Sequence, residues 1–585
     1  MEEHKSVEEM DCDAPVARAV ELLNSRKYSE ANSFICAAPS DTILAHGWDL
    51  VLPVVSAMEN EIDAKSEENV SLCKDLLEVI TSRGKPKEVL ISLLEHLQLI
   101  KSSAGFRAVL QCLQKLLPNL SRNRLVFLDL ILESLHSHLK PLSASVAKVG
   151  WEEAAGDCST ESQDSRNLGY CLNAIVEFFS GFTLHHHLQE EPGMAECPRA
   201  ENVLILRYLM LFLGDIAALD LRSRANVSPP NVARLSAEGL LSHISKRSTD
   251  LIKLSFSRDA TECKGKSSDT EDAEKNLPEP VSPVCRAVLA WLIFVENLEQ
   301  DRVPCVYSSR YIFEHSLQNM MLLLSHSSGH VVSKGVALCA TLISRLCLGE
   351  FSYMDLDNSN FIALLRCLGK VIIYSSSSLS RRTALSTFVD YIKCFKHEAR
   401  YILYCRTLQV EKHAGLRGLL IDLYRQDMHA VSKTSIQEDT FWGTNFLEFV
   451  KIVSNFSQDQ TDILDDSDCV LAVLNLIRYF ASVLPFQGQT CQKANQSTCE
   501  MARKYVEQVK KSVDQTRAHY KVELEHNKEK VRGCDVGSQE SLLPSLPPEQ
   551  EAEVLKTALT RLDLVESVLV LAVDSVNHCA KEVMQ

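Results

Sequence analysis

Glycine and proline are scarce in this chain. Only 21 Gly and 18 Pro occur among its 585 residues, and both counts fall below average usage in globular proteins. Because tight turns depend on these two residue types, their scarcity favours long helices over a turn-rich β-architecture. A chain of this length also exceeds what one hydrophobic core supports, so we expect two or more domains or an extended repeat array.

Long uncharged apolar runs are missing as well. No stretch of about 18 uncharged apolar residues occurs, so no transmembrane helix is predicted. The N-terminal segment 1–13 is acidic and lacks an apolar core, so we expect no signal peptide. We therefore expect a cytoplasmic protein with reduced thiols. The formal net charge of −16 disfavours binding to nucleic acid or to an anionic membrane surface.

The sequence also lacks the common catalytic and metal-binding motifs. Its 20 cysteines include no Cys-x-x-Cys pair, and GxxxxGKS/T, GxGxxG, HExxH and GxSxG do not occur. His185, His186 and His187 are consecutive, so on a helix they point about 100° apart and cannot converge on one ion. We interpret them as a solvated loop. No catalytic residue, cofactor or metal is predicted, which makes an enzyme the least favoured function class.

Helical periodicity, in contrast, recurs along nearly the whole chain. An apolar stripe at three- and four-residue spacing indicates a helix over 125–140, and a similar stripe indicates one over 88–100. Strict alternation of apolar and polar residues is rare, so few or no strands are expected. The first stripe consists of Leu125, Leu128, Leu132, Leu135 and Leu139, and the second of Val89, Leu93, Leu97 and Ile100. Further helices are predicted over 203–219, 284–298, 331–348, 361–374 and 384–395.

The connections between these helices predict how the helices pack. Links such as 82–87 and 117–122 are short, and short links make consecutive helices antiparallel neighbours. One helix pair cannot hide its apolar stripes, so neighbouring pairs must stack. Pairs of about 40 residues without a clean repeat length favour an irregular all-α HEAT/armadillo-like helical repeat, an α-solenoid. An irregular all-helical globule is the alternative.

Polar stretches divide the array into regions. We expect an N-terminal helical region over 1–256, a polar, disordered linker over 257–283 and a second helical region over 284–524. A further polar linker over 525–552 precedes a C-terminal helix within 553–585. A well-formed helix that follows a loose linker either docks back onto its own chain or meets a partner.

The segment 465–480, DDSDCVLAVLNLIRYF, is the most informative part of the sequence. Asp465, Asp466 and Asp468 stand where a helix N-terminus prefers negative charge. The residues that follow are apolar around most of a helix, so this helix must be sandwiched between others. Its polar edge consists of Asn475, Arg478 and Ser482. We therefore expect Arg478 to be displayed on the rim of a packed helical layer.

Basic residues recur on the predicted helices of the C-terminal half. Cations on helical repeats commonly serve solubility, whereas arginine is also enriched at interface hot spots. Both interpretations stay open, and the second applies to the group rather than to any one residue. The group consists of Arg400, Arg406, Arg417, Arg425, Arg478, Arg503, Lys504, Lys510, Lys511, Arg517 and Lys521.

Several ordered segments resemble the glomulin family, most specifically those in the C-terminal part. They are GWDLVLPVV (47–55), KPKEVLISLLE (85–95), VSKGVALCATLISRL (332–346), LDDSDCVLAVLNLIRYF (464–480), SVDQTRAHYKVELE (512–525) and LKTALTRLDLVESVL (555–569). Residues from about 150 to 283 resemble the family poorly.

The resemblance implies an all-helical HEAT-like fold and a non-enzymatic inhibitor of cullin–RING ubiquitin ligases. Proteins of this family bind the RING-box subunit through their C-terminal region and thereby block docking of the ubiquitin-conjugating enzyme. Carried over by residue, the partner-binding candidates are Arg478 in LNLIRYF and Arg425 in LIDLYRQDM, with Tyr479 and Tyr520 as secondary candidates.

Two alternatives remain. For Arg478, the structural alternative is an ion pair with a neighbouring repeat, since such pairs are common and weak. For the whole chain, the functional alternative is a general helical-repeat adaptor. Such an adaptor would bind an immunophilin, chaperone or receptor client without inhibiting a ligase.

Overall fold

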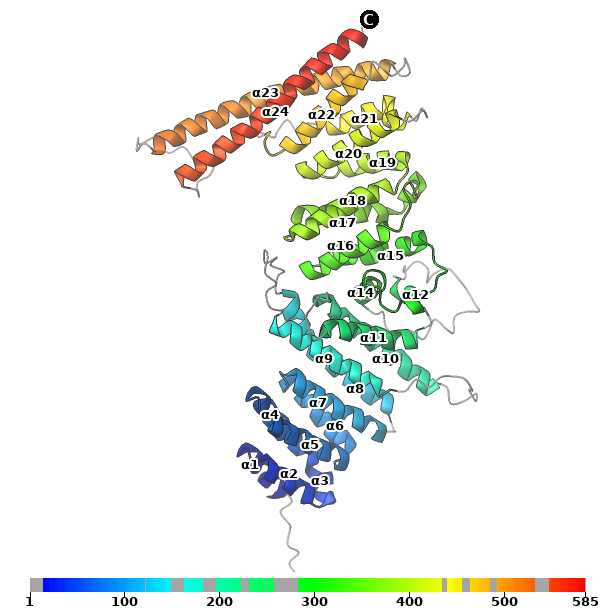
Figure 1. Ribbon diagram of the computed structural model, residues 1–585, viewed down its shortest axis with the longest axis vertical. Helices are drawn as coiled ribbons and strands as arrows, with labels where there is room; N and C mark the ends of the chain where they lie inside the picture. Colours follow the sequence, from blue (N-terminus) through cyan, green and yellow to red (C-terminus); the bar gives the residue numbers. More distant parts are fainter. Residues whose placement is uncertain are drawn as a thin grey trace, which may run out of the picture. The chain divides into compact units, whose positions relative to one another are not determined.

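The computed structural model describes residues 14–120, 123–148, 162–182, 196–221, 231–248, 250–256, 282–433, 439–454, 463–483, 492–531 and 547–583. Within these ranges the regular structure is helical, and the β pairing is limited to an isolated bridge between Phe351 and Phe395 (Figure 1). The predicted all-α helical-repeat fold is therefore confirmed. None of the described helices combines the length and apolarity needed to cross a bilayer. His185–His187 and residues 257–281 lie outside the described ranges.

The helices group into two compact units. Unit 1 comprises Met1–Arg345 and Tyr374–Thr387, and unit 2 comprises Leu346–Ile373 and Phe388–Gln585. The expected linker 257–283 thus falls within the sequence of unit 1. The two helices that flank it, α12 (Leu251–Ser255) and α14 (Pro283–Phe294), pack against each other.

Unit 1 contains helices of 5 to 25 residues. Its other elements are α1 (Ala14–Asn24), α2 (Tyr28–Ala37), α3 (Ser40–His46), η1 (Gly47–Leu50), α4 (Val51–Asp63), α5 (Glu67–Arg83), α6 (Pro86–His96), η2 (Leu97–Leu99), α7 (Ser103–Leu116), η3 (Leu117–Asn119), α8 (Arg124–Lys148), α9 (Gln163–Ser180), α10 (Glu196–Asp215), η4 (Ile216–Ala218), α11 (Val232–Arg247), η6 (Gln300–Arg302), α15 (Ser309–Leu324) and α16 (Gly329–Ile343).

The N-terminal part of unit 1 has two layers. Contacts link α4, α6, α8 and α10 in one layer, with η2 between α6 and α8, and α5, α7, α9 and α11 in the other. The predicted stripes supply the core between the layers. Leu128, Leu132, Leu135 and Leu139 of α8 are fully buried, whereas Leu125, in the first turn, is half-buried. Burial of each such leucine contributes about 1.5–3 kcal/mol.

Side chains from later parts of unit 1 satisfy carbonyl groups at the ends of earlier helices. The buried ammonium group of Lys334, on α16, donates to the carbonyl oxygens of Ile216, Ala217 and Leu219 at distances of 3.1, 2.5 and 2.6 Å. Arg345 donates to the carbonyl of Phe294 at 3.1 Å. The last carbonyls of a helix lack intrahelical partners, so these cations also complement the negative end of the helix dipole.

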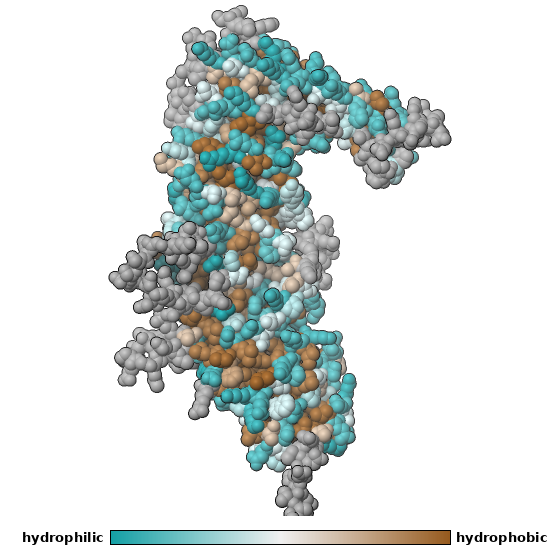
Figure 2. Space-filling view, turned by 180° about the vertical axis from the view of Figure 1, so that it is seen from behind, coloured by the Kyte–Doolittle hydropathy of each residue, from teal (hydrophilic) through white to brown (hydrophobic). Residues whose placement is uncertain are grey.

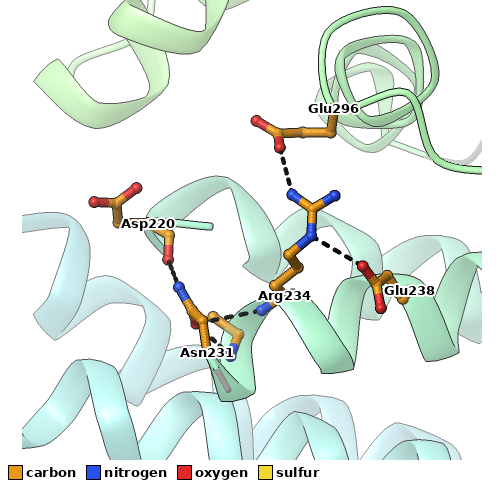
Figure 3. Close-up of polar contacts among 6 residues, drawn as sticks. Asp220, Asn231, Arg234, Glu238 and Glu296 are labelled. Carbon is orange, nitrogen blue, oxygen red and sulfur yellow. Dashed lines mark hydrogen bonds and ion pairs between the residues drawn. The ribbon is translucent and has the colours of Figure 1, made fainter. Parts of the chain in front are cut away.

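A polar junction fixes the start of α11 (Figure 3). Asn231 caps the helix with its Oδ1 and donates from Nδ2 to the carbonyl of Asp220 at 3.0 Å. Arg234 donates to Glu238 on the same helix and to Glu296, which follows α14, both at 2.9 Å. Two carboxylates therefore neutralise one half-buried guanidinium, and the ion pair with Glu296 ties α11 to the end of α14.

Unit 2 ends in two helices of 40 and 36 residues, which are longer than any described helix of unit 1. Its elements are η7 (Tyr353–Asp357), α17 (Ser359–Tyr374), α18 (Ser378–Lys393), α19 (His397–Leu408), α20 (Ala414–Ser432), η8 (Asp439–Phe441), α21 (Gly443–Val453), α22 (Ser467–Val483), α23 (Gln492–Val531) and α24 (Pro548–Val583). The chain passes between the units after Arg345, after Ile373 and, within α18, after Thr387. Of the expected polar linker 525–552, the first residues belong to α23 and the last to α24.

Candidate partner-binding surface

The segment singled out in the sequence forms α22. The helix begins at Ser467, with Asp468 in its first turn and Asp465 and Asp466 just before it, so the three carboxylates stand at the positive end of the helix dipole. As predicted, the helix is packed on several sides, and its neighbours are α20 and α24. Its buried apolar residues include Val470, Val473, Leu474, Leu476, Ile477 and Phe480.

A glycine allows α20 and α22 to approach closely. A Cβ atom at Gly418 of α20 would lie 2.9 Å from the carbonyl oxygen of Asp468 and 3.2 Å from its carbonyl carbon. Real Cβ atoms do not come this near to backbone atoms, so any larger residue would push the two helices apart. The absence of this side chain therefore sets the position of α22 on α20.

Arg478 lies on the polar edge of α22, as the sequence predicts. Its side chain is half-buried, and Nη1 donates to Oδ1 of Asn475, one turn earlier, at 3.3 Å. Its Nε is buried and has no hydrogen-bond partner in the described part of the chain. Arg478 also forms no ion pair with any described residue. These residues therefore do not show the alternative arrangement, a salt bridge to a neighbouring repeat.

Tyr479 joins α22 to α20. Its hydroxyl lies 3.0 Å from Nδ1 of His429 and 3.3 Å from Oγ of Ser432, and its ring meets the His429 ring edge-on with centroids 5.5 Å apart. His429 and Ser432 were not predicted from the sequence. Their spacing from Arg425, four and seven residues, places them on one face of α20 and is the signal that could have revealed them.

Arg425 stands on that face, one turn before His429. Its Nε and Nη2 both donate to Oδ1 of Asp422, at 2.9 and 2.7 Å. The ion pair is partly exposed, so it contributes little to stability and leaves Arg425 able to exchange Asp422 for another carboxylate. We call Arg425, His429, Ser432, Arg478 and Tyr479 the α20–α22 surface.

Tyr520, the remaining candidate, lies on a different helix. It is half-buried on α23, where its ring contacts that of His519 at a centroid distance of 5.9 Å. Tyr520 is therefore placed on a different helix from the residues of the α20–α22 surface. The candidates therefore divide into three residues on the packed pair α20 and α22 and one on α23.

Two members of the predicted basic group have structural roles. Arg400 pairs with Asp427 at 2.8 Å and is largely buried, while also donating to the carbonyls of Phe395 and Lys393 at the end of α18. Arg517 of α23 pairs with Asp563 and Glu566 of α24 at 2.8 and 2.6 Å. These two arginines hold neighbouring helices together, which makes them unsuitable as contacts to a partner.

The side chains near this surface include a buried thiol on α22. Burial raises the pKa of the Cys469 thiol to about 11, so at neutral pH it is not a thiolate nucleophile. Among the described residues, no group of three His, Cys, Asp or Glu side chains is arranged to hold a metal ion. What the surface offers is two cations and a tyrosine ring on a rigid pair of helices, the residue types enriched in protein interfaces.

Comparisons with known proteins agree with the resemblance found in the sequence. The profile described as "Uncharacterised protein family, YAP/Alf4/glomulin" matches residues 40–154 and 308–558. Glomulin from Mus musculus is 24% identical over 551 residues, which cover 90% of this chain and 87% of that protein. Glomulin from Homo sapiens is 22% identical over 530 residues, which cover 89% and 86%. The family profile matches more than half of the chain, and the protein therefore belongs to the YAP/Alf4/glomulin family.

Proposed function

We propose that this protein is a non-enzymatic inhibitor of cullin–RING ubiquitin ligases that acts in the cytoplasm. In this proposal the α20–α22 surface binds the RING-box subunit and covers the site where the ubiquitin-conjugating enzyme docks. Inhibition then requires only steric exclusion, and any zinc in the complex belongs to the RING partner. Family membership supports this direction, because the resemblance to glomulin implies RING-box binding.

The observation that carries the proposal is the partial burial of the Arg478 side chain without a carboxylate partner among the described residues. A half-buried guanidinium has already lost part of its hydration, yet among the described residues it has no carboxylate partner. A carboxylate or carbonyl oxygen from a partner would complete its hydrogen bonds at a small additional desolvation cost. The neighbouring Tyr479, held by His429, adds a rigid aromatic surface, and such residues carry much of the energy of protein interfaces.

A second function, that of a general helical-repeat adaptor, uses the same kind of surface. It predicts that an immunophilin, a chaperone or a receptor client binds while ubiquitin-chain synthesis continues. The two functions therefore differ in one measurable result, the activity of the ligase when this protein is bound.

The binding experiment uses the full chain and a purified RING-box–cullin complex. We expect wild-type protein to bind and Arg478→Glu to weaken the affinity by about tenfold or more, as for an interface hot spot. Arg166→Glu, which makes the same charge change at an exposed position on α9, is the control and should bind like wild type.

Circular dichroism and thermal unfolding must show that both variants remain folded. If wild type does not bind the complex, the proposed function is wrong. If wild type and Arg478→Glu bind equally, the function stands but the assignment of Arg478 to the interface fails.

A further inference from the structure

Unit 1 carries a row of exposed apolar side chains in the layer formed by α4, α6 and α8. Each of these side chains is between 38% and 66% exposed, although residues of this size are usually buried. Figure 2 shows apolar side chains gathered over the N-terminal part of the chain, in the lower part of the view. We call this set the apolar row. It consists of Trp48 of η1, Leu52 of α4, Ile91 of α6, and Val126 and Leu130 of α8.

Two contacts show that the helical segments that carry the row lie side by side. The hydroxyl of Ser92, next to Ile91, donates to the carbonyl of Trp48 at 3.1 Å, which places the start of α4 beside the middle of α6. The ammonium group of Lys87 lies 5.8 Å from the centre of the Phe127 ring. One helical turn beyond this contact come Ile91 on α6 and Leu130 on α8. The row therefore crosses consecutive helices of one layer.

An acidic edge accompanies the apolar row. Glu95 lies one turn after Ile91 on α6, and Glu133 lies one turn after Leu130 on α8, and both are exposed. Within the described part of the chain, neither carboxylate has an ion-pair or hydrogen-bond partner, whereas Glu88 on the same helix pairs with Lys85 at 3.2 Å. A surface with an apolar row and unpaired carboxylates along one side complements an apolar and basic ligand.

We propose that the apolar row and its acidic edge bind an amphipathic α-helix of a partner protein, with lysine or arginine along one border of its apolar face. Neighbouring helices in a layer are about 8–10 Å apart. A helix laid across them presents apolar residues at i and i+7 about 10.5 Å apart, because each residue rises about 1.5 Å. Apolar residues of the ligand that are two turns apart thus meet Trp48, Ile91 and Leu130 in order, while its cations meet Glu95 and Glu133. This binding is independent of the α20–α22 surface.

The test uses a defined synthetic probe. A fluorescently labelled peptide of about 18 residues, or five helical turns, carries leucine at i, i+3, i+4 and i+7 positions and lysine along one border. A second peptide has the same composition in scrambled order, and a third has glutamate in place of lysine. Fluorescence anisotropy with the full chain measures each affinity. We expect the first peptide to bind about tenfold or more tightly than either of the others.

Matched variants locate the binding. The double variant Ile91→Glu/Leu130→Glu should lose about tenfold or more in affinity for the first peptide. Leu235→Glu/Leu322→Glu makes the same changes at two exposed leucines on α11 and α15 and should bind it normally. Glu95→Lys/Glu133→Lys should reverse the preference between lysine and glutamate peptides. All variants are checked by thermal unfolding. We expect their unfolding temperatures to match that of wild type, because the altered positions are exposed.

Three results would overturn the proposal. One is equal affinity for the ordered and scrambled peptides, and another is equal affinity of wild type and the Ile91→Glu/Leu130→Glu variant. The third comes from analytical ultracentrifugation. A concentration-dependent dimer that this double variant abolishes would assign the apolar row to a second copy of the chain instead.

Discussion

Asp215 allows a stability prediction that depends on pH. This carboxyl, at the end of α10, is 8% exposed, and its Oδ2 atom has no hydrogen-bond partner among the described residues. Burial raises the pKa of Asp215 from 3.8 to about 6, although a hydrogen bond with Ser143 opposes the rise. The folded protein therefore holds the proton more tightly than the unfolded chain does.

The sign and size of the effect follow from this pKa difference. A raised pKa contributes stability that is complete below pH 3.8 and is lost as the pH rises through about 6. The difference of about two pH units corresponds to roughly 3 kcal/mol, at ~1.4 kcal/mol per unit. Asp215→Asn cannot ionise, so we expect the variant to be more stable than wild type by roughly 3 kcal/mol near pH 8 and by about half as much near pH 5.

The assay is urea unfolding of the full chain at both pH values, combined with hydrogen exchange of the backbone amides in α8 and α10. Exchange identifies the local opening around Asp215 even where the two units unfold separately. Asp63→Asn, at an exposed carboxyl at the end of α4, is the control and should change stability at neither pH. An Asp215→Asn variant whose advantage is absent near pH 8, or is the same at both pH values, would refute the reasoning.

Two further predictions concern packing. Lys334→Met removes the ammonium group that donates to three buried carbonyls and lies 4.8 Å from the Trp291 ring. We expect the free energy of unfolding of unit 1 to fall by about 3 kcal/mol, since each unsatisfied buried acceptor costs ~1–3 kcal/mol. An unchanged unfolding transition, monitored by tryptophan fluorescence, would contradict this prediction. Gly418→Val places a side chain against the Asp468 backbone and should destabilise unit 2 by about 2 kcal/mol or more. Gly329→Ala is the control and should be neutral or stabilising, because a Cβ atom there would meet no other atom within 4 Å. Calorimetry that ranks the two variants the other way would contradict the packing of α20 against α22.

The class of fold could be predicted from the sequence because apolar residues recur at the helix positions that are buried in the structure. The stripe predicted over 88–100 shows this, since Val89, Leu93, Leu97 and Ile100 are all buried. The same reasoning placed α22 between other helices, and its contacts with α20 and α24 confirm that prediction. Helix ends were less predictable. α24 begins at Pro548, before the predicted start at residue 553, because exposed polar residues also extend a helix when its apolar face is packed.

The candidate surface was predicted only in part. The position of Arg478 on a polar helix edge follows from spacing alone, but the contact of Tyr479 with His429 joins residues 50 positions apart in the chain. Spacing within one helix carries no information about such a pair. For the same reason, Arg400 and Arg517 looked like other exposed cations in the sequence. Their carboxylate partners on neighbouring helices show that they are structural.

The central proposal is tested most directly by ubiquitin-chain synthesis. A reconstituted cullin–RING ligase with its ubiquitin-activating and ubiquitin-conjugating enzymes is assayed with increasing amounts of this protein. The account predicts that chain synthesis falls toward zero as the RING-box subunit becomes saturated, and that Arg478→Glu shifts the inhibition curve to about tenfold higher concentration. Full ligase activity at saturating wild-type protein would contradict the account.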